Sequence, residues 1–252
     1  MATDGGAVAA VEVNVGSAEP VPAQPPAKAK PKKRRGKRPP GRKLFQYDRA
    51  LGFRYVAGAD EAGRGCLAGP LTAAGVLFDM QALGLREVKA LAALNDSKQH
   101  THAGREALYP LVLRCATRAV VVSRSCESID RRGLHRTNLD ALRDALARVS
   151  SGFPEGEVIC LSDGFRVPDL GREQRAIVDG DCTSAAIAAA SILAKVARDR
   201  FMVRAEARHP GWAFGEHMGY STPVHREAIR RRGVSPLHRM SFASTAYQQL
   251  SL

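Results

Sequence analysis

The feature that most constrains this chain is a short apolar run, residues 55–59, that ends on the adjacent carboxylates Asp60 and Glu61. Aromatic, β-branched and small residues in such a run are typical of a buried strand. Adjacent acids alone are as often solvated surface as part of a site. Here they precede Gly63-Arg64-Gly65, in which the glycines allow a ligand to approach the backbone and the arginine offers a bidentate cation. The combination favours a phosphodiester substrate.

Strand and helix patterns alternate through most of the chain. Strands are expected over residues 53–59, 71–78, 116–123 and 157–162, and helices over 99–115, 134–149, 183–207 and 223–232. Residues 81–97 and 166–175 show no decisive pattern. This order predicts an α/β fold in one domain, residues 45–252, with an added C-terminal helical section.

The first 44 residues differ in composition from the rest of the chain. Ala, Pro, Gly and Val dominate, and residues 28–43 contain ten Lys or Arg and no acid. Such a segment buries too little apolar surface to offset its ordering entropy, so a disordered basic N-terminal extension is expected over residues 1–44. With ten bases against three acids, it carries +7 of the formal net charge of +13. It is either a tether to nucleic-acid phosphates or a solubilising tail.

Charge and cysteine content restrict the partners and the compartment. A sequence pI near 10.0 favours a polyanionic partner, most commonly nucleic acid. No apolar run approaches membrane-spanning length, so no membrane partner is expected. The five cysteines show no CxxC spacing, which argues against a disulfide framework or zinc site and favours the cytoplasm. Nothing in the sequence demands a partner chain, and a monomer is expected.

Two further acids occupy positions where ligands commonly bind. Asp163 follows the apolar run 157–162, and chemistry in α/β proteins gathers beyond strand ends. Asp181 precedes the alanine-rich helix, whose positive end favours an anion and for which Thr183 or Ser184 is the expected cap. Taken singly, each is as readily explained as a turn residue or a helix-start acid.

Four acids in one place would need a counter-charge. Like charges that converge repel one another, and a hard divalent cation with oxygen ligands is the usual remedy. Without an accompanying His-Cys cluster, carboxylates favour Mg²⁺ or Mn²⁺ over zinc. Two such ions can activate a water molecule and stabilise the leaving oxygen during displacement at phosphorus.

Several stretches of the chain, in order across about residues 53–233, resemble prokaryotic ribonuclease HII. They are Gly58-Ala59-Asp60-Glu61-Ala62-Gly63-Arg64-Gly65 with Ala68-Gly69-Pro70, Leu94-Asn95-Asp96-Ser97-Lys98, Asp163-Gly164, Gly180-Asp181, the run 184–199 that ends on Lys195-Val196-Ala197-Arg198-Asp199, and Gly219-Tyr220-Ser221-Thr222 followed by His225. The resemblance implies a ribonuclease H-like mixed sheet flanked by helices. It also implies an endonuclease that hydrolyses the RNA strand of RNA–DNA hybrids and incises 5′ of single ribonucleotides in duplex DNA, leaving 3′-hydroxyl and 5′-phosphate ends.

The same resemblance assigns the catalytic metal ligands. By similarity they are Asp60, Glu61, Asp163 and Asp181. Asp60 would bridge two ions, with Asp181 on the nucleophile side and the other two acids opposite. The expected cofactors are therefore two Mg²⁺ or Mn²⁺ ions.

The resemblance also implies the substrate-binding residues. The loop expected to sense the ribose 2′-hydroxyl comprises Gly63, Arg64 and Gly65, and Tyr220 is expected to pack against the sugar of the next nucleotide. Only the 2′-hydroxyl distinguishes RNA from DNA at one position. Ser221 stands where the family commonly has glycine, a departure that bears on the orientation of Tyr220.

Other functions remain open from the residues alone. One alternative is a noncatalytic nucleic-acid-binding protein that acts through the basic extension. A two-carboxylate glycosidase needs no metal but fits neither the pI nor the count of four acids. Lys195 and Arg198 are candidates either for phosphate contact or for a solvated helix face. Lys98 is a candidate either for contact with the substrate backbone or for pairing with Asp96. Asp199 is interpreted as an ion-pair partner of a neighbouring arginine, and His217 and His225 are left out of the catalytic set.

Overall fold

The structure is a computed structural model that describes residues 10–13, 40–242 and 247 of the chain. Most of the segment expected to be disordered, residues 1–9 and 14–39, lies outside the described residues. The expected boundary at residue 44 is wrong. Helix α1 (Gly41–Ala50) begins before it and buries Leu44 and Phe45, and strand β1 (Ala10–Val13) pairs with the central sheet. The ten residues of α1 follow directly on a long basic run, so their amphipathic pattern was not separated from that run.

The described strands form one mixed sheet. They are β1 (Ala10–Val13), β2 (Tyr55–Ala62), β3 (Leu71–Asp79), β4 (Arg118–Arg124), β5 (Val158–Asp163) and β6 (Gln174–Ile177), in the order β1-β4-β3-β2-β5-β6. Strand β2 runs antiparallel to β3 and parallel to β5, and β5 runs parallel to β6. The mixed sheet expected from the family resemblance is confirmed.

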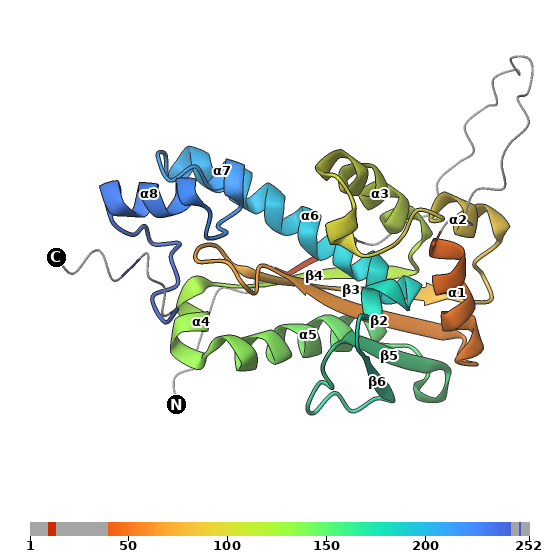
Figure 1. Cartoon of the computed structure of the whole chain (residues 1–252). Coiled ribbons are helices and arrows are strands. Elements are labelled where there is room, and N and C mark those ends of the chain that lie inside the picture. The colour runs from red at the N-terminus through yellow and green to blue at the C-terminus, as the bar shows by residue number, and fades with distance from the viewer. Residues whose placement is uncertain (1–9, 14–39, 243–246, 248–252) are drawn as a thin grey trace, which may run out of the picture.

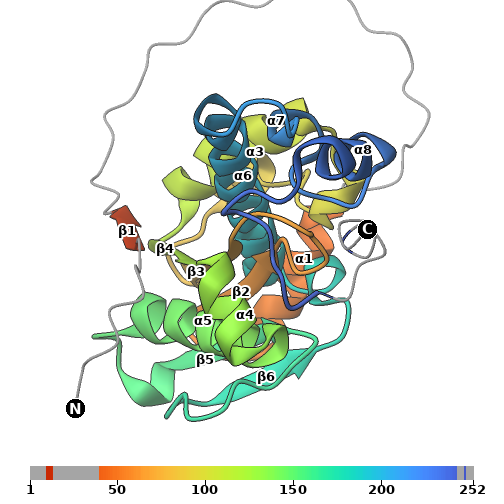
Figure 2. The same cartoon turned by 90° about the vertical axis from the view of Figure 1, so that its left-hand side faces the viewer.

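Helices cover both faces of this sheet. They are α1 (Gly41–Ala50), α2 (Leu85–Ala90), α3 (His102–Cys115), α4 (Cys126–Arg132), α5 (Leu134–Ser150), α6 (Ala185–Arg208), α7 (Phe214–His217) and α8 (Pro223–Arg232). Figures 1 and 2 show α6 on one face and α5 on the other, with α1 to α3 on the α6 side. The last two helices lie at one end, where they form the expected C-terminal helical section (Figure 1). Within the described ranges, none of the helices has the length and apolar character that a membrane crossing requires.

The alternation of side chains along β2 divides the core in two. Val56 packs in the cluster beneath α6, whereas Tyr55, Ala57 and Ala59 pack in the cluster beneath α5, as expected when successive strand residues face opposite ways. At Gly58 the backbone of α6 approaches so closely that an added Cβ would overlap Ala186. Small residues on both elements therefore allow α6 to lie directly on the strand that carries the adjacent acids.

The start of α6 is fixed by two side chains. Ser184 is its N-cap and accepts from Ile187 N at 3.3 Å. The fully buried Asp48 of α1 accepts from Ala186 N at 2.9 Å. These bonds satisfy amides that a helix leaves without an intrahelical acceptor, and they fix the turn that precedes α6. Of the two predicted caps, Ser184 is confirmed.

Candidate active site

The strand ends bring three of the predicted acids together. Strands β2 and β5 are parallel with Ala59 opposite Ser162, so the following residues, Asp60 and Asp163, lie at the same end of neighbouring strands. Strand β2 continues through Ala62, so Asp60 and Glu61 belong to the strand rather than to the loop after it. Pairing with β3 extends β2 by three residues beyond the predicted end.

The fourth acid reaches the site from the turn before α6. Asp181 lies in the 3₁₀ turn Gly180–Cys182. The amide of Gly180 donates to Asp163 Oδ1 at 2.7 Å, which joins this turn to the end of β5. The structure thus brings together Asp60, Glu61, Asp163 and Asp181.

The four acids lie close enough for their charges to act on one another. Burial, and then the charges of Glu61 and Asp163, raise the pKa of Asp60 well above its usual value. Burial raises the pKa of Glu61, the charge of Asp163 raises it further, and Arg64 opposes the rise. Burial, followed by the charges of Asp96 and Asp163, raises the pKa of Asp181 to about 6. Asp163 therefore acts on each of the other three acids.

The donor set fits a hard divalent cation. Glu61 Oε2 is buried and has no hydrogen-bond partner, so this site contains an acceptor that the protein itself leaves unsatisfied. The converging groups are carboxylates, which Mg²⁺ and Mn²⁺ prefer. In the part of the chain that the structure describes, no group of three or more His, Cys, Asp or Glu side chains is arranged closely enough to hold a metal ion as it stands. The residues present fit such an ion once the acids draw together around it.

Several residues beside the acids could not be identified as site residues from the sequence. Asp96 lies beside Asp181. The hydroxyl of Ser191 lies beside Asp60, whose pKa it lowers, and bonds to Ser97 Oγ at 2.8 Å. The only indication in the sequence was that Ser191 is a polar residue within an alanine-rich run.

Asn138 on α5 is a further neighbour that the sequence did not indicate. Its side chain is fully buried and close enough to Glu61 to lower the pKa of that acid. Neither amide atom of Asn138 has a hydrogen-bond partner of normal geometry. Because buried polar groups are normally paired, this side chain and Glu61 Oε2 together mark an unsatisfied polar pocket beside the acids.

The predicted arginine of the loop lies next to the acids. Arg64 Nη1 is 3.7 Å from Glu61 Oε1, and its guanidinium lies 4.9 Å from the centre of the Phe165 ring. Gly63 is buried at a φ of +93°, and an added Cβ there would overlap Arg198. Gly65 is exposed with open space around its Cα. The loop thus has one glycine facing the protein and one facing outward.

Tyr220 is 41% exposed and its backbone is held by two histidines. Its amide donates to His217 O at 2.9 Å, and its carbonyl accepts from His225 Nδ1 at 2.9 Å. Lys195 Nζ lies 5.3 Å from the ring centre. Ser221 is not among the residues with positive φ, so serine adopts this backbone without strain. The departure at Ser221 therefore introduces no backbone strain beside Tyr220.

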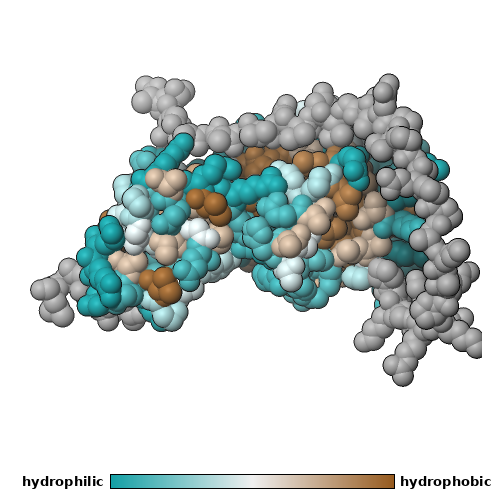
Figure 3. Space-filling model, turned by 90° about the horizontal axis from the view of Figure 1, so that it is seen from above, coloured by the Kyte–Doolittle hydropathy of each residue, from teal (hydrophilic) through white to brown (hydrophobic). Residues whose placement is uncertain are grey.

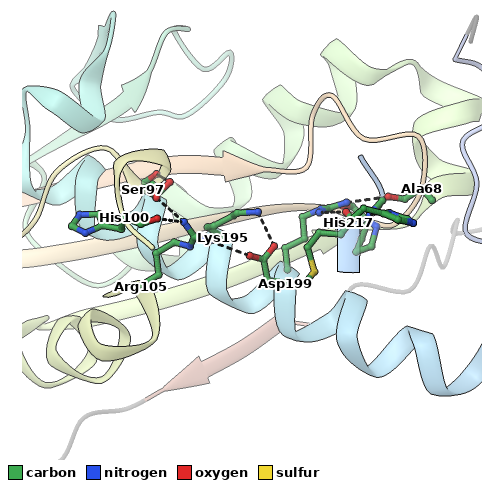
Figure 4. Close-up of polar contacts among 12 residues, drawn as sticks. Ala68, Ser97, His100, Arg105, Lys195, Asp199 and His217 are labelled. Carbon is green, nitrogen blue, oxygen red and sulfur yellow. Dashed lines mark hydrogen bonds and ion pairs between the residues drawn. The ribbon is translucent and has the colours of Figure 1, made fainter. Parts of the chain in front are cut away.

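The remaining candidates have structural partners. Lys195 pairs with Asp199 at 2.8 Å, and Arg105 of α3 approaches the same acid at 3.9 Å while donating to the carbonyls of Ser97 and His100 (Figure 4). Asp199 is an ion-pair partner, but its closer partner is Lys195 rather than the expected neighbouring arginine. The expectation of a solvated helix face is wrong for Arg198, which is fully buried.

Lys98 keeps its charge in this setting. Partial burial lowers its pKa, but the nearby carboxylates, Asp96 first, raise it more. The backbone amide of Lys98 donates to Asp96 Oδ1 at 2.8 Å, which gives the segment a local turn. A cation thus lies beside the converging acids.

Comparisons with known proteins identify the family. A family model described as Ribonuclease HII matches residues 57–245. The chain is 48% identical over 194 residues to the ribonuclease HII of Mycobacteroides abscessus, covering 77% of this chain and 79% of that protein. It is 47% identical over 191 residues to the ribonuclease HII of Mycobacterium tuberculosis, covering 76% of this chain and 69% of that protein.

Solved structures show the same fold. The ribonuclease HII of Archaeoglobus fulgidus, solved in complex with PCNA, matches with a TM-score of 0.60 and 29% identity over 75% of this chain and 95% of that one. The ribonuclease H2 of Pyrococcus horikoshii gives 0.63 and 24% over 78% and 96%. Bst-RNase HIII in complex with Mn²⁺ gives 0.59 and 22% over 81% and 71%.

Proposed function

The chain belongs to the ribonuclease HII family, and from this premise we propose that it incises duplex DNA on the 5′ side of single embedded ribonucleotides, leaving 3′-hydroxyl and 5′-phosphate ends. As a member of that family it is a metal-dependent endoribonuclease that acts on the RNA strand of RNA–DNA hybrids. The observation that carries the proposal is the convergence of four acids beside a loop whose backbone faces outward.

The acids supply the cation site. The residues that would hold the ions are Asp60, Glu61, Asp163 and Asp181. Two Mg²⁺ or Mn²⁺ ions bound there would lower the pKa of an attacking water and stabilise the leaving oxygen. Burial of Asp60 and Asp181 limits competition from bulk water, and Arg64 and Lys98 place positive charge where a phosphodiester would lie.

The loop and the tyrosine would read the sugar. Backbone amides at residues 63–65 can donate to a 2′-hydroxyl, which a deoxyribose lacks. The exposed ring of Tyr220 offers a flat apolar surface for the sugar of the following nucleotide. Positioning by backbone rather than by long side chains gives this contact a fixed geometry.

Asp163→Asn tests the catalytic assignment. We expect this variant to lose at least about 100-fold of its incision of a duplex with one ribonucleotide, because a neutral side chain binds cations poorly. Its fold should be kept, since an amide oxygen can still accept from Gly180 N. Asp169→Asn is the matched control, because Asp169 lies in the β5–β6 connection at a φ of +54°, which asparagine tolerates. Full activity of Asp163→Asn, or of the wild type in excess EDTA, would sink the proposal.

We also propose that the protein acts as a monomer in the cytoplasm. All five cysteines are free, which suits a reducing compartment. Light scattering during gel filtration tests the first statement, and a mass near twice the 27.1 kDa of the chain would contradict it.

A further inference from the structure

The loop from Gly63 to Pro70 is hydrogen-bonded asymmetrically. Among the described residues, the backbone N–H groups of residues 63–65 have no acceptor, whereas those of residues 66–69 all have one. The acceptors of the second group are the carbonyls of Gly63, Gly219 and Leu237. Within the described ranges, three consecutive amides are therefore unpaired, and they belong to the segment proposed to read the sugar.

The carbonyl groups of the same loop are held by two fully buried arginines. Arg239 donates from Nη1 to Arg64 O at 3.1 Å, and from Nε and Nη2 to Gly69 O at 3.0 and 2.8 Å. Arg198 donates from Nε to Pro70 O at 2.9 Å and from Nη2 to Ala68 O at 3.0 Å; Ala68 is labelled in Figure 4.

These two arginines bond to backbone carbonyl groups rather than to carboxylates. Both have fully buried side chains, and no carboxylate forms an ion pair with either one in the described part of the chain. A buried charge is costly unless its hydrogen bonds are satisfied. Here carbonyls of the 63–70 loop provide most of that satisfaction, with Met218 O as one further acceptor of Arg198. A hydrophobic side chain could fill such a core position without the free-energy cost of burying a charge. The two arginines must therefore do something other than fill space.

The planarity of the peptide links the two observations. In a trans peptide the carbonyl and the following N–H point in opposite directions. When Arg239 draws the Arg64 carbonyl inward, the N–H of Gly65 is directed outward. Gly63 lies so close to Arg198 that an added Cβ would overlap it, so the loop rests directly on the guanidinium.

We infer that Arg198 and Arg239 are positioning residues that hold the 63–70 loop with its free amides toward the ribose, and so set the preference for ribose over deoxyribose. This inference rests on the proposed function. Neither side chain touches the substrate in this account. Each acts through the backbone of the loop, and Arg239 does so from a segment far along the chain.

The test is Arg239→Lys, which keeps the charge but cannot make all three bonds at once. Binding is measured in the Asp163→Asn background with Mg²⁺, so that the duplex is not cut. Two duplexes are compared that differ only in a single ribonucleotide. The preference for the ribonucleotide duplex is the Kd of the all-DNA duplex divided by the Kd of the ribonucleotide duplex. We expect this ratio to fall about fivefold to tenfold, which corresponds to the loss of about one hydrogen bond. The affinity for the all-DNA duplex should stay unchanged.

Arg172→Lys is the matched control. Arg172 also donates to a carbonyl, that of Phe153, which precedes β5 at the end opposite Asp163. This control should leave the Kd ratio unchanged. If Arg239→Lys does not fold, as judged by thermal unfolding, Arg198→Lys takes its place with the same expectation.

The inference is overturned if the folded Arg239→Lys variant keeps the wild-type ratio. It is also overturned if affinity for both duplexes falls in parallel, because that result describes general structural support. A parent protein that shows neither preference for the ribonucleotide duplex nor, with Asp163 intact, incision of it would refute the proposed function itself, independently of Arg239.

Discussion

Asp163 is the acid whose charge acts on all three of the other acids. Its charge raises the pKa of Asp60, of Glu61 and of Asp181, after the effect of burial in each case. Repulsion of this kind destabilises the fold in the absence of a cation, and such destabilisation is common where function requires it.

We therefore predict that Asp163→Asn raises the free energy of unfolding in EDTA by roughly 1 kcal/mol. The measurement is urea denaturation in EDTA and again in millimolar Mg²⁺. A ligand that binds the folded state stabilises it, so Mg²⁺ should raise the stability of the wild type more than that of the variant. A variant that is less stable than the wild type in EDTA would contradict the repulsion argument.

Asp48 provides a pH dependence remote from the cation site. Burial raises its pKa to about 7, against the hydrogen bonds from Ser184 and Ala186, which lower it. The unfolded value is 3.8, so the folded protein binds more protons between these values. The contribution of this group to stability is therefore complete below pH 3.8 and is lost as the pH rises through about 7.

Asp48→Asn should flatten this dependence. Between about pH 5 and about pH 8, we expect the wild type to lose roughly 2 kcal/mol more stability than the variant does. Urea unfolding at the two pH values measures the difference, and the comparison cancels the titration of all other groups. Parallel pH profiles for the two proteins would exclude a raised pKa at Asp48.

At the scale of elements, the site depends on direct contact between α6 and β2. The backbone of Ala186 and Ile187 occupies the place of a side chain at Gly58. Gly58→Ala must push the helix away from the strand, and with it the turn that carries Asp181. We predict a loss of about 1–3 kcal/mol in stability, typical of overpacking, together with reduced incision.

Gly156→Ala is the control for this substitution, because nothing lies within 4 Å of an added Cβ there. Urea denaturation and the incision assay are run on both variants. If Gly58→Ala were as stable and as active as Gly156→Ala, the close approach of α6 would not be required for the site.

The elements with long or regular patterns could be predicted from the sequence. Helix α8 has the predicted limits, and α5 and α6 lie within two residues of theirs. The ten-residue α1, which directly follows the basic run, was also missed. The other missed helices and strands are short: α2, α4, α7, β1 and β6 each span four to seven residues. Such segments offer too few residues for a periodicity to emerge, and tertiary contacts decide their structure.

For the site, the sequence could identify acids and the glycine loop but not the residues that hold them. Asp60 and Asp163 end apolar runs, a local signal that predicts their meeting. The bond from Arg239 to Arg64 spans 175 positions, and the bond from Ser191 to Ser97 spans 94. Nothing local distinguishes a buried arginine from an exposed one, so these contacts required the fold.

At the scale of the whole molecule, positive charge is divided between the basic extension and the folded part. Residues 1–44 carry +7 of the +13 total. Helix α8 ends on three arginines, and the end of the molecule that bears α7 and α8 is largely hydrophilic in Figure 3. Both regions are suited to the backbone of a nucleic acid, which is bound with little sequence preference.

Deletion of residues 1–39 separates binding from catalysis. The limit is chosen because α1 begins at Gly41. The deletion also removes strand β1, so the thermal unfolding of the truncated protein is first compared with that of the whole chain. We expect kcat to remain within about twofold, the Kd for duplex to rise, and the dependence of log Kd on log salt to become shallower as phosphate contacts are lost. Loss of turnover in the truncated protein would favour the alternative in which the extension is the functional part.

In our proposal, residues 60–65 have two separate functions: the acids perform the chemistry, and the loop recognises the ribose. The most direct measurement is incision of an end-labelled duplex with one ribonucleotide beside its all-DNA counterpart, by the wild type, Asp163→Asn and Arg239→Lys. We predict 5′ incision by the wild type of the ribonucleotide duplex alone. Asp163→Asn should bind that duplex preferentially without cutting it, and Arg239→Lys should cut it with weakened preference. Equal cutting of both duplexes by the wild type, or cutting by Asp163→Asn, would contradict the account.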